Sequence, residues 1–124
     1  MEAVLKVTII TPCYNGAETI RDCVASIKAQ SYQMIEHIIV DGGSQDGTLE
    51  ILDELSARYV SEKDYGIYDA MNKGVSLASG SIIGILNCDD YLSDRLVIEN
   101  IVREFNSGAY DVVHAKVAQI DENH

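Results

Sequence analysis

The sequence predicts an α/β fold in which a mostly parallel sheet is flanked by helices. Short apolar segments rich in β-branched residues alternate with segments whose apolar residues recur at helical spacing. The expected strands are apolar on both faces, which is typical of a parallel sheet covered by helices. The chain has 124 residues, of which 47% are apolar, so we expect one domain with a hydrophobic core.

The apolar segments place five strands along the chain. The first is LKVTII, and the second begins with EHIIV and ends at Asp41. The third, within ARYVSEKD, is the weakest, whereas the fourth, SIIGILN, reads as a buried strand. The expected strands cover residues 5–10, 36–41, 57–64, 81–87 and 110–120.

Four helices are expected between these strands. The second can be capped by Ser44 or Asp46, because both side chains accept hydrogen bonds from the first helical amides. Glycines give stop signals for the third and fourth helices, at Gly80 and near Gly108. The four helical segments lie within residues 18–30, 44–59, 66–80 and 94–108.

Three polar loops follow the expected strands. They are TPCYNG at residues 11–16, DGGSQDG at residues 41–47 and NCDD at residues 87–90. In open parallel sheets, ligands bind beyond the carboxyl ends of the strands. The three loops are therefore expected to meet at one edge of the sheet and to form the functional site.

The balance of charge limits the class of partner. The formal net charge is −11, which argues against nucleic acid or an anionic membrane as the main partner. A phosphate ligand remains compatible with this charge if a divalent cation reverses the local sign. The three cysteines form no CxxC pair, so neither a zinc site nor a disulfide framework is expected. A reduced, cytoplasmic setting is the simplest interpretation.

The adjacent carboxylates of Asp89 and Asp90 need an explanation, because like charges side by side repel. One interpretation is that they cap the following helix, although Asp94 could do this equally well. The other is that they hold a hard cation, because Mg²⁺ or Mn²⁺ takes one or two carboxylates and fills its other positions with phosphate oxygens and water. The second interpretation predicts a divalent cation that in turn holds a diphosphate.

Two further residues of the polar loops suggest contacts to a nucleotide. Asp41 ends a buried strand and must find hydrogen-bond donors, which a nucleobase ring N–H or a ribose hydroxyl would supply. Tyr14 could stack on a base. Ordinary turn chemistry is the alternative for both loops. The cysteines, and Tyr65, Tyr68 and Met71, are expected to have packing roles.

Taken together, these segments resemble glycosyltransferase family 2, the inverting nucleotide-sugar transferases of the A-type, Rossmann-like fold. VTIITPCYNGAETI resembles the opening strand and base-binding loop of that family, and HIIVDGGSQDGTLEIL resembles its second strand. SEKDYGIYDAMNKGVSLASGSIIGILNCDDYL is similar to the segment that leads to the metal-binding DxD motif. The resemblance covers nearly the whole chain.

The resemblance implies a role for eight residues. Two are metal ligands, Asp89 at the second acidic position of DxD and Asp90 as the carboxylate that often follows; the first DxD position is Asn87 instead. Six would contact the donor: Pro12 and Tyr14 line the base with Thr11 beside them, Asp41 accepts from the base ring N–H, and Asp64 and Lys73 border the nucleotide or its diphosphate.

The expected function is inverting transfer from a nucleotide-diphosphate sugar, chiefly a UDP-sugar, in polysaccharide or glycan synthesis. The acceptor would be a glycan or a lipid-linked molecule, and the full-length protein would act in the cytoplasm or at the inner face of the membrane. Residues 1–124 would form the nucleotide-sugar-binding portion of a single domain, without the acceptor half.

Three expectations depend on that missing half. The catalytic base stays unassigned, so the 124-residue chain alone is expected to be inactive. Exposed apolar surface could drive homo-oligomerisation.

The alternative function is a module that binds a nucleotide-sugar without turnover. A third possible function is that of a metal-dependent nucleotidyltransferase or hydrolase, which the lack of a basic phosphate loop disfavours.

Overall fold

The computed structural model describes residues 4–107. The expected fifth strand at residues 110–120 and the stop signal at Gly108 lie outside the described residues. Strands and helices alternate through the described part, as predicted. Their order is β1 (Val7–Cys13), α1 (Ile20–Lys28), β2 (Ile35–Asp41), α2 (Thr48–Glu54), β3 (Tyr59–Ser61), α3 (Ile67–Leu77), β4 (Ile82–Ile85) and α4 (Val97–Asn106).

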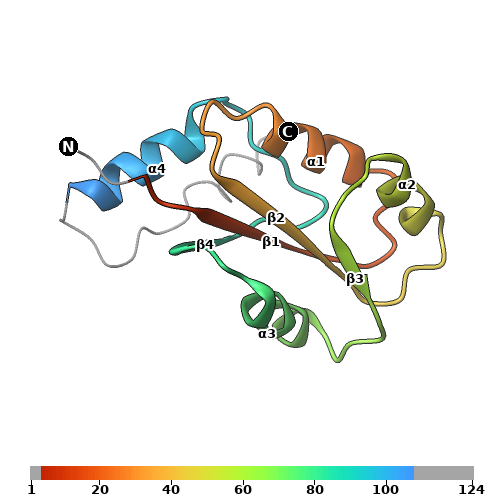
Figure 1. Cartoon of the computed structure of the whole chain (residues 1–124). Helices are drawn as coiled ribbons and strands as arrows, with labels where there is room; N and C mark the ends of the chain where they lie inside the picture. The colour runs from red at the N-terminus through yellow and green to blue at the C-terminus, as the bar shows by residue number, and fades with distance from the viewer. Residues whose placement is uncertain (1–3, 108–124) are drawn as a thin grey trace.

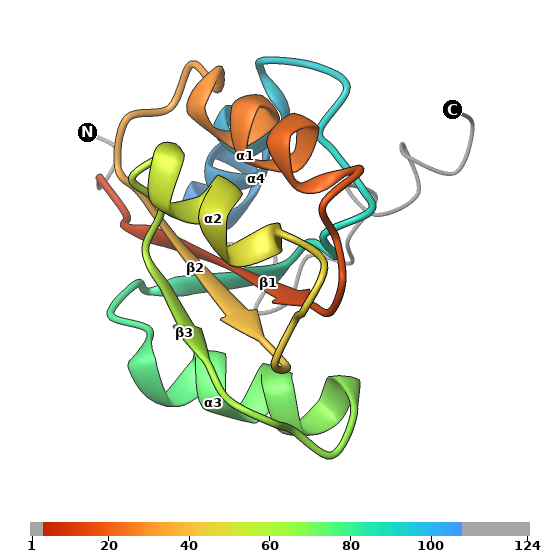
Figure 2. The ribbon, with the colours of Figure 1, turned by 90° about the vertical axis from the view of Figure 1, so that its right-hand side faces the viewer.

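The four described strands form one parallel sheet in the order β3-β2-β1-β4. Helices α1, α2 and α4 lie on one face of the sheet, and α3 lies on the other (Figures 1 and 2). This arrangement confirms the predicted α/β class with a parallel sheet flanked by helices. The chain adds strands outward from β1 to β3 and then crosses to the other side of β1 for β4, so the strand order reverses between β1 and β4.

Strand β1 is longer than the sequence predicts. The expected strand ended at residue 10, but pairing with β2 continues through Thr11, Pro12 and Cys13. The carbonyl of Pro12 accepts a hydrogen bond from the Cys88 amide, on the side of the sheet where regular pairing with β4 has ended. A backbone amide at residue 12 would have pointed to that same side of β1. The proline therefore costs the sheet few backbone hydrogen bonds.

The core is divided between the two faces of the sheet. The larger cluster packs β1, β2 and β4 against α1, α2 and α4, and its fully buried members include Ile20, Leu52 and Ile98. The smaller cluster packs Ile10, Ile38, Val40 and Ala70 under α3. The alternation of apolar side chains on both faces of β1 and β2 explains why these strands read as continuous apolar segments.

Two helix ends differ from the sequence-based prediction. Helix α3 ends at Leu77, three residues before the predicted stop at Gly80. Helix α4 begins at Val97, and the Asp94 carboxylate accepts a hydrogen bond at 2.7 Å from the amide of Leu96, the residue just before the helix. Asp89 and Asp90 therefore lie well before the helix that they could have capped. Among residues 4–107, no helix combines the length and apolar character that crossing a bilayer requires.

The tyrosines near α3 do not pack as expected. Tyr65 is 91% exposed and Tyr68 is 78% exposed. Tyr65 lies just before α3, and Tyr68 lies in its first turn. The expectation that they are packing residues is wrong, because an aromatic side chain at a helix start carries no signal of which face the sheet will cover.

The carboxylate of Glu36, near the start of β2, joins two distant segments. It accepts hydrogen bonds from the Ser79 amide at 2.9 Å and the Thr8 hydroxyl at 2.7 Å. Its other oxygen pairs with Arg58 at 2.7 Å. These bonds favour the ionised form and lower the pKa of Glu36 from 4.5 to about 2.

The neighbouring His37 titrates at low pH for a different reason. Burial is the main cause that lowers the pKa of His37 from 6.5 to about 4, and the nearby charge of Lys28 contributes to the same shift. Its Nε2 atom lies 2.7 Å from the hydroxyl of Thr11. The folded chain therefore favours the neutral imidazole over a pH interval in which an unfolded chain takes up a proton.

We expect the free energy of unfolding to fall as the pH drops from 6.5 towards 4, because the unfolded chain binds a proton at His37 that the folded chain rejects. The contribution is on the order of 3 kcal/mol when complete. Urea unfolding at a series of pH values measures it. His37→Gln should flatten this interval, whereas Glu36→Gln should change the slope only below pH 4.5. Equal slopes in His37→Gln and the unaltered chain above pH 4.5 would contradict this account.

Candidate functional site

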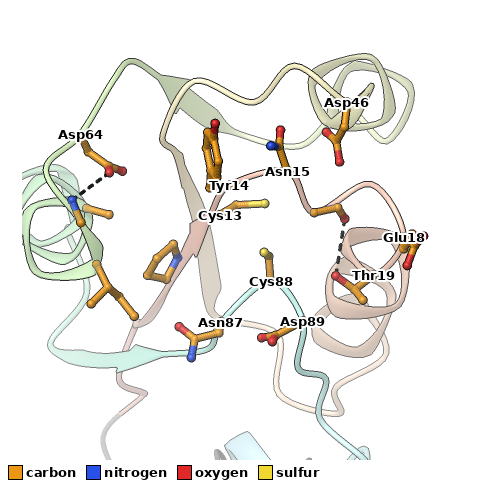
Figure 3. Close-up of a pocket in the computed structure, with 15 residues that line it drawn as sticks. Cys13, Tyr14, Asn15, Glu18, Thr19, Asp46, Asp64, Asn87, Cys88 and Asp89 are labelled. Atoms are coloured by element: carbon orange, nitrogen blue, oxygen red, sulfur yellow. Dashed lines mark hydrogen bonds between the residues drawn. The ribbon is translucent and has the colours of Figure 1, made fainter.

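A cleft of about 710 Å³ opens at the carboxyl ends of β1 and β4. Its lining comes from the β1–α1, β2–α2 and β3–α3 loops and from the segment after β4 (Figure 3). The three polar loops predicted to converge therefore do meet, and Asp64 joins them from a fourth. The cleft lies where the strand order reverses, which is the place where open α/β sheets bind their ligands.

A second cavity of about 540 Å³ adjoins the cleft, and Tyr14 and Asp64 line both. The Tyr14 side chain is 63% exposed. Pro12 also lines the cleft. Of the six residues predicted to contact a donor, Pro12, Tyr14 and Asp64 are thus brought together at the cleft.

Asp41 lies beneath this surface and does not line either cavity. Its carboxylate is fully buried at the end of β2. One oxygen accepts hydrogen bonds from the Gly43 amide at 3.0 Å, the Ser44 amide at 2.8 Å and the Ser61 hydroxyl at 2.8 Å. The other oxygen accepts from the Ser44 hydroxyl. Four donors from the chain itself hold this carboxylate, so it fixes the β2–α2 loop against β3.

The β2–α2 loop is in turn joined to the β1–α1 loop by four hydrogen bonds, which we call the loop clasp. The Asn15 amide donates to the Ser44 hydroxyl at 2.7 Å, and the Gln45 amide donates to the Asn15 side chain at 2.9 Å. The remaining two bonds run from the Gly16 amide to the Thr48 hydroxyl at 3.0 Å and from the Ala17 amide to the Asp46 carboxylate at 3.1 Å. The clasp holds one wall of the cleft in place without a ligand.

Asp46 also organises the start of α2, as one of the two predicted candidates. Its carboxylate accepts hydrogen bonds from the amide and the hydroxyl of Thr48. These bonds lower the pKa of Asp46, with the Thr48 hydroxyl as the largest cause. Ser44, the other candidate, is instead engaged with Asp41.

Asp64 occupies space that a side chain at residue 42 would otherwise fill. A Cβ atom at Gly42 would lie 2.8 Å from a carboxylate oxygen of Asp64, which is closer than real Cβ contacts allow. The other oxygen of Asp64 accepts a hydrogen bond from the Gly66 amide at 3.1 Å. Glycine at residue 42 thus lets the β3–α3 loop deliver its carboxylate to the rim of both cavities.

The segment after β4 supplies two oxygen-bearing side chains to the cleft, Asn87 and Asp89 (Figure 3). The Oδ1 atom of Asn87 is buried and has no hydrogen-bond partner, which is costly for a polar atom. Asp89 is exposed beside it. An unsatisfied amide oxygen next to a carboxylate fits a hard divalent cation, which prefers oxygen ligands.

The protein alone supplies too few side-chain ligands to complete the proposed cation site. Among residues 4–107, no group of three or more His, Cys, Asp or Glu side chains could hold a metal ion. Asp90, the second predicted ligand, does not line the cleft; its amide closes a turn on the Asn87 carbonyl at 3.0 Å. A cation held by Asn87 and Asp89 would therefore need further ligands from phosphate and water.

Two predicted donor contacts lie away from the cleft. Thr11 is fully buried within β1, where its hydroxyl contacts His37. Lys73, on α3, pairs with Glu62 at 3.1 Å and Asp69 at 3.2 Å. Neither side chain is among those that line the two cavities.

Two cysteines line the cleft, although the sequence suggested only packing roles for them. Cys13 ends β1, Cys88 follows β4, and their sulfur atoms point toward one another (Figure 3). A hydrogen bond between the two thiols raises the pKa of Cys13 and lowers that of Cys88, and burial raises that of Cys13 further. Their equal position in the register of two neighbouring strands is the signal that could have found them.

The sequence profile of glycosyl transferase family 2 matches residues 8–124, which is nearly the whole chain. The chain belongs to glycosyl transferase family 2. Members of this family use nucleotide-sugar donors. The glycosyltransferase GlyG of Streptococcus pneumoniae serotype 4 is 32% identical over 123 residues, which cover 94% of this chain and 40% of GlyG.

Two solved structures share the fold. A mannosyltransferase from Pyrobaculum calidifontis, in complex with GDP-mannose and Mn²⁺, has a TM-score of 0.77 and 26% identity, over 90% of this chain and 34% of its own. TarS of S. aureus, in complex with UDP-GlcNAc, has a TM-score of 0.77 and 21% identity, over 82% of this chain and 31% of its own. The chain thus spans less than half the length of these proteins and matches the A-type fold over that part.

Substituting Asp41 should destabilise this glycosyltransferase fold. Asp41→Ala removes the acceptor of four hydrogen bonds in a buried site, so we expect the free energy of unfolding to fall by about 3 kcal/mol. Urea unfolding measures the change, and Asp22→Ala, at an exposed carboxylate on α1, is the matched control. A loss no larger than that of the control would mean that Asp41 does not organise the loop.

Proposed function

We propose that the cleft binds the nucleotide diphosphate of a UDP-sugar together with Mg²⁺ or Mn²⁺. In the whole protein, the sugar would be transferred with inversion to a hydroxyl of a glycan or lipid-linked acceptor. The observation that carries this proposal is that Asn87, whose Oδ1 atom is unsatisfied, and the exposed Asp89 both line the cleft of a family 2 chain.

The charge of the cleft supports a role for the cation. Four carboxylates line it, from Glu18, Asp46, Asp64 and Asp89, and none of its described lining residues is Lys, Arg or His. A diphosphate would meet like charge there. Asn87 and Asp89 would hold a cation that, when bound, neutralises charge on the leaving diphosphate. Asp90 lies outside the lining, so we expect it to contribute less.

The base is assigned to the side where the two cavities adjoin. The exposed ring of Tyr14 offers a stacking surface, and Pro12 offers an apolar floor. Asp64 borders both cavities, and its carboxylate can accept from the N3–H group of uracil. We assign this contact to Asp64 rather than to Asp41, because the chain already saturates the buried Asp41 carboxylate with four donors.

Transfer of the sugar requires two further features besides a site that binds the donor. A general base must lie within hydrogen-bond reach of the acceptor hydroxyl, and walls must align that hydroxyl with the anomeric carbon. Within residues 4–107 we assign no side chain to the role of base. Donor binding without transfer by the 124-residue chain would therefore agree with this assignment.

UDP should bind to the chain only when Mn²⁺ or Mg²⁺ is present. We expect Asp89→Asn to weaken the metal-dependent binding of UDP by at least about tenfold, because it removes the charged ligand of the cation. Isothermal titration calorimetry with UDP, in the presence of Mn²⁺ or of a chelator, measures this. Asp90→Asn is the matched control and should weaken binding less.

Two results would overturn this metal assignment. Equal affinity for UDP with Mn²⁺ and with chelator would exclude a bridging cation. A greater loss in Asp90→Asn than in Asp89→Asn would move the ligand to the carboxylate outside the cleft.

Base selectivity should depend on Asp64. A carboxylate accepts from uracil N3–H, whereas the amide of Asp64→Asn can also donate to the unprotonated N3 atom of cytosine, so this variant should lose its preference for UDP over CDP. Asp41→Asn should weaken both nucleotides to the same extent. Competition titrations with UDP and CDP in Mn²⁺ test this. A selective loss of UDP in Asp41→Asn but not in Asp64→Asn would return base recognition to Asp41.

A further inference from the structure

We propose that Cys13 and Cys88 form a redox-sensitive dithiol site on the floor of the cleft, where a peroxide converts the two thiols into a reversible disulfide. The crosslink depends only on the geometry of this pair. Its effect on nucleotide binding rests on the proposed function.

The sheet places the two cysteines opposite one another. Strand β1 pairs with β4 so that Ile10 lies beside Ile85, and the same offset carried three residues further joins Cys13 to Cys88. The ladder continues past the assigned end of β4, because the Leu86 amide donates to the Ile10 carbonyl at 3.0 Å and the Cys88 amide donates to the Pro12 carbonyl at 3.3 Å. Neighbouring strands lie about 4.8 Å apart. This spacing is within the range of about 4.4–6.8 Å that Cα atoms adopt across a disulfide.

The side chains also converge. A Cβ atom at Gly16 would lie 2.8 Å from the Cys13 sulfur and 2.9 Å from the Cys88 sulfur, so both sulfur atoms border the same small volume. Figure 3 shows the two sulfur atoms pointing toward one another across the cleft floor. Glycine at residue 16 leaves the space that the pair occupies, and any side chain there would push the two sulfur atoms aside.

Access distinguishes these thiols from the third one. Cys88 is partly exposed and lines the open cleft, so a small oxidant can reach it. Cys13 is only 4% exposed but lines the same cleft, whereas Cys23, on α1, is fully buried in the larger core cluster and does not line it. Cys88 is therefore the thiol that reacts with the oxidant first, and Cys13 is positioned to attack the oxidised Cys88 sulfur.

The chemistry balances with a peroxide as the oxidant. Hydrogen peroxide transfers a hydroxyl group to the Cys88 sulfur and leaves as water, which gives a sulfenic acid. The Cys13 sulfur then attacks the Cys88 sulfur, the S–O bond breaks, and the hydroxyl leaves with the Cys13 proton as a second water. Two thiols are oxidised and one peroxide is reduced. An accessible disulfide of this kind is reversible by an added dithiol.

The crosslink should weaken nucleotide binding. Forming a bond of about 2.05 Å between the sulfur atoms turns both cysteine side chains and ties the segment after β4 to β1. Asn87 and Asp89 flank Cys88 in that segment, so the bond restrains both oxygen ligands. We therefore expect the oxidised chain to bind UDP with Mn²⁺ about tenfold more weakly than the reduced chain.

Peptide mapping tests the site directly. The purified 124-residue chain is treated with hydrogen peroxide, unreacted thiols are alkylated under denaturing conditions, and the digest is analysed by mass spectrometry. We expect a peptide pair linked through Cys13 and Cys88, an alkylated Cys23, and loss of the link after dithiothreitol. Cys23→Ser should keep the link, whereas Cys13→Ser and Cys88→Ser should lose it. A link through Cys23, or oxidation to sulfinic acid without a link, would overturn the proposal.

A second measurement uses the unaltered chain without an oxidant, so it does not depend on whether the substituted chains fold. Phenylarsine oxide bridges two neighbouring thiols, so the reduced chain should bind one equivalent and be protected by it from alkylation at Cys13 and Cys88. Protection of neither cysteine would contradict their proximity.

The UDP titrations separate this proposal from the proposed function. If the reduced chain fails to bind UDP with Mn²⁺ while the crosslink forms, the proposed function fails and the dithiol site stands. If the reduced and the crosslinked chains bind UDP equally, the effect of the disulfide on the cleft is excluded.

Discussion

The buried carboxylate of Asp41 is the interaction on which the rest of the site depends. It lies at the end of the central strand β2 and collects donors from the loop that follows and from Ser61 on β3. Ser44, which donates to it, then accepts from the Asn15 amide and so begins the loop clasp. A charged group without these bonds would be too costly to bury, so the folded chain cannot form its core here without also ordering the wall of the cleft.

The topology of the sheet explains why the cleft lies beside this wall. Strand β1 continues to Cys13, whereas β4 ends at Ile85, and the chain after β4 stays beside β1 through the two amides that donate to the Ile10 and Pro12 carbonyls. Asn87 and Asp89 project from that segment, opposite the loop clasp. Asn87 and Asp89, two residues apart on this segment, both line the same cleft.

The sequence predicted the fold because apolar runs and helical spacing report directly on burial. The polar loops predicted Pro12, Tyr14 and Asp89 at the cleft because parallel strands bring their ends together, and Asp64 was predicted only from the family resemblance. Position along the chain could not show that Asp41 is saturated by its own loop, since the number of returning donors depends on the path of that loop. The ion pair of Lys73 with Glu62 and the exposure of Tyr65 were hidden for the same reason: each depends on the tertiary structure around the residue.

The acidity of the chain is consistent with a phosphate-bearing ligand once the cleft is considered by itself. Its described lining carries carboxylates from four separate segments of the chain and no basic side chain. A diphosphate alone would be repelled from such a surface, and the repulsion is strongest where the walls exclude water. A cation held by Asn87 and Asp89 is attracted by the same charges that repel the diphosphate. The surrounding acids therefore raise the affinity of the cleft for the cation and repel a nucleotide that carries no cation. As a consequence, the cleft selects a nucleotide whose charge is neutralised by a cation.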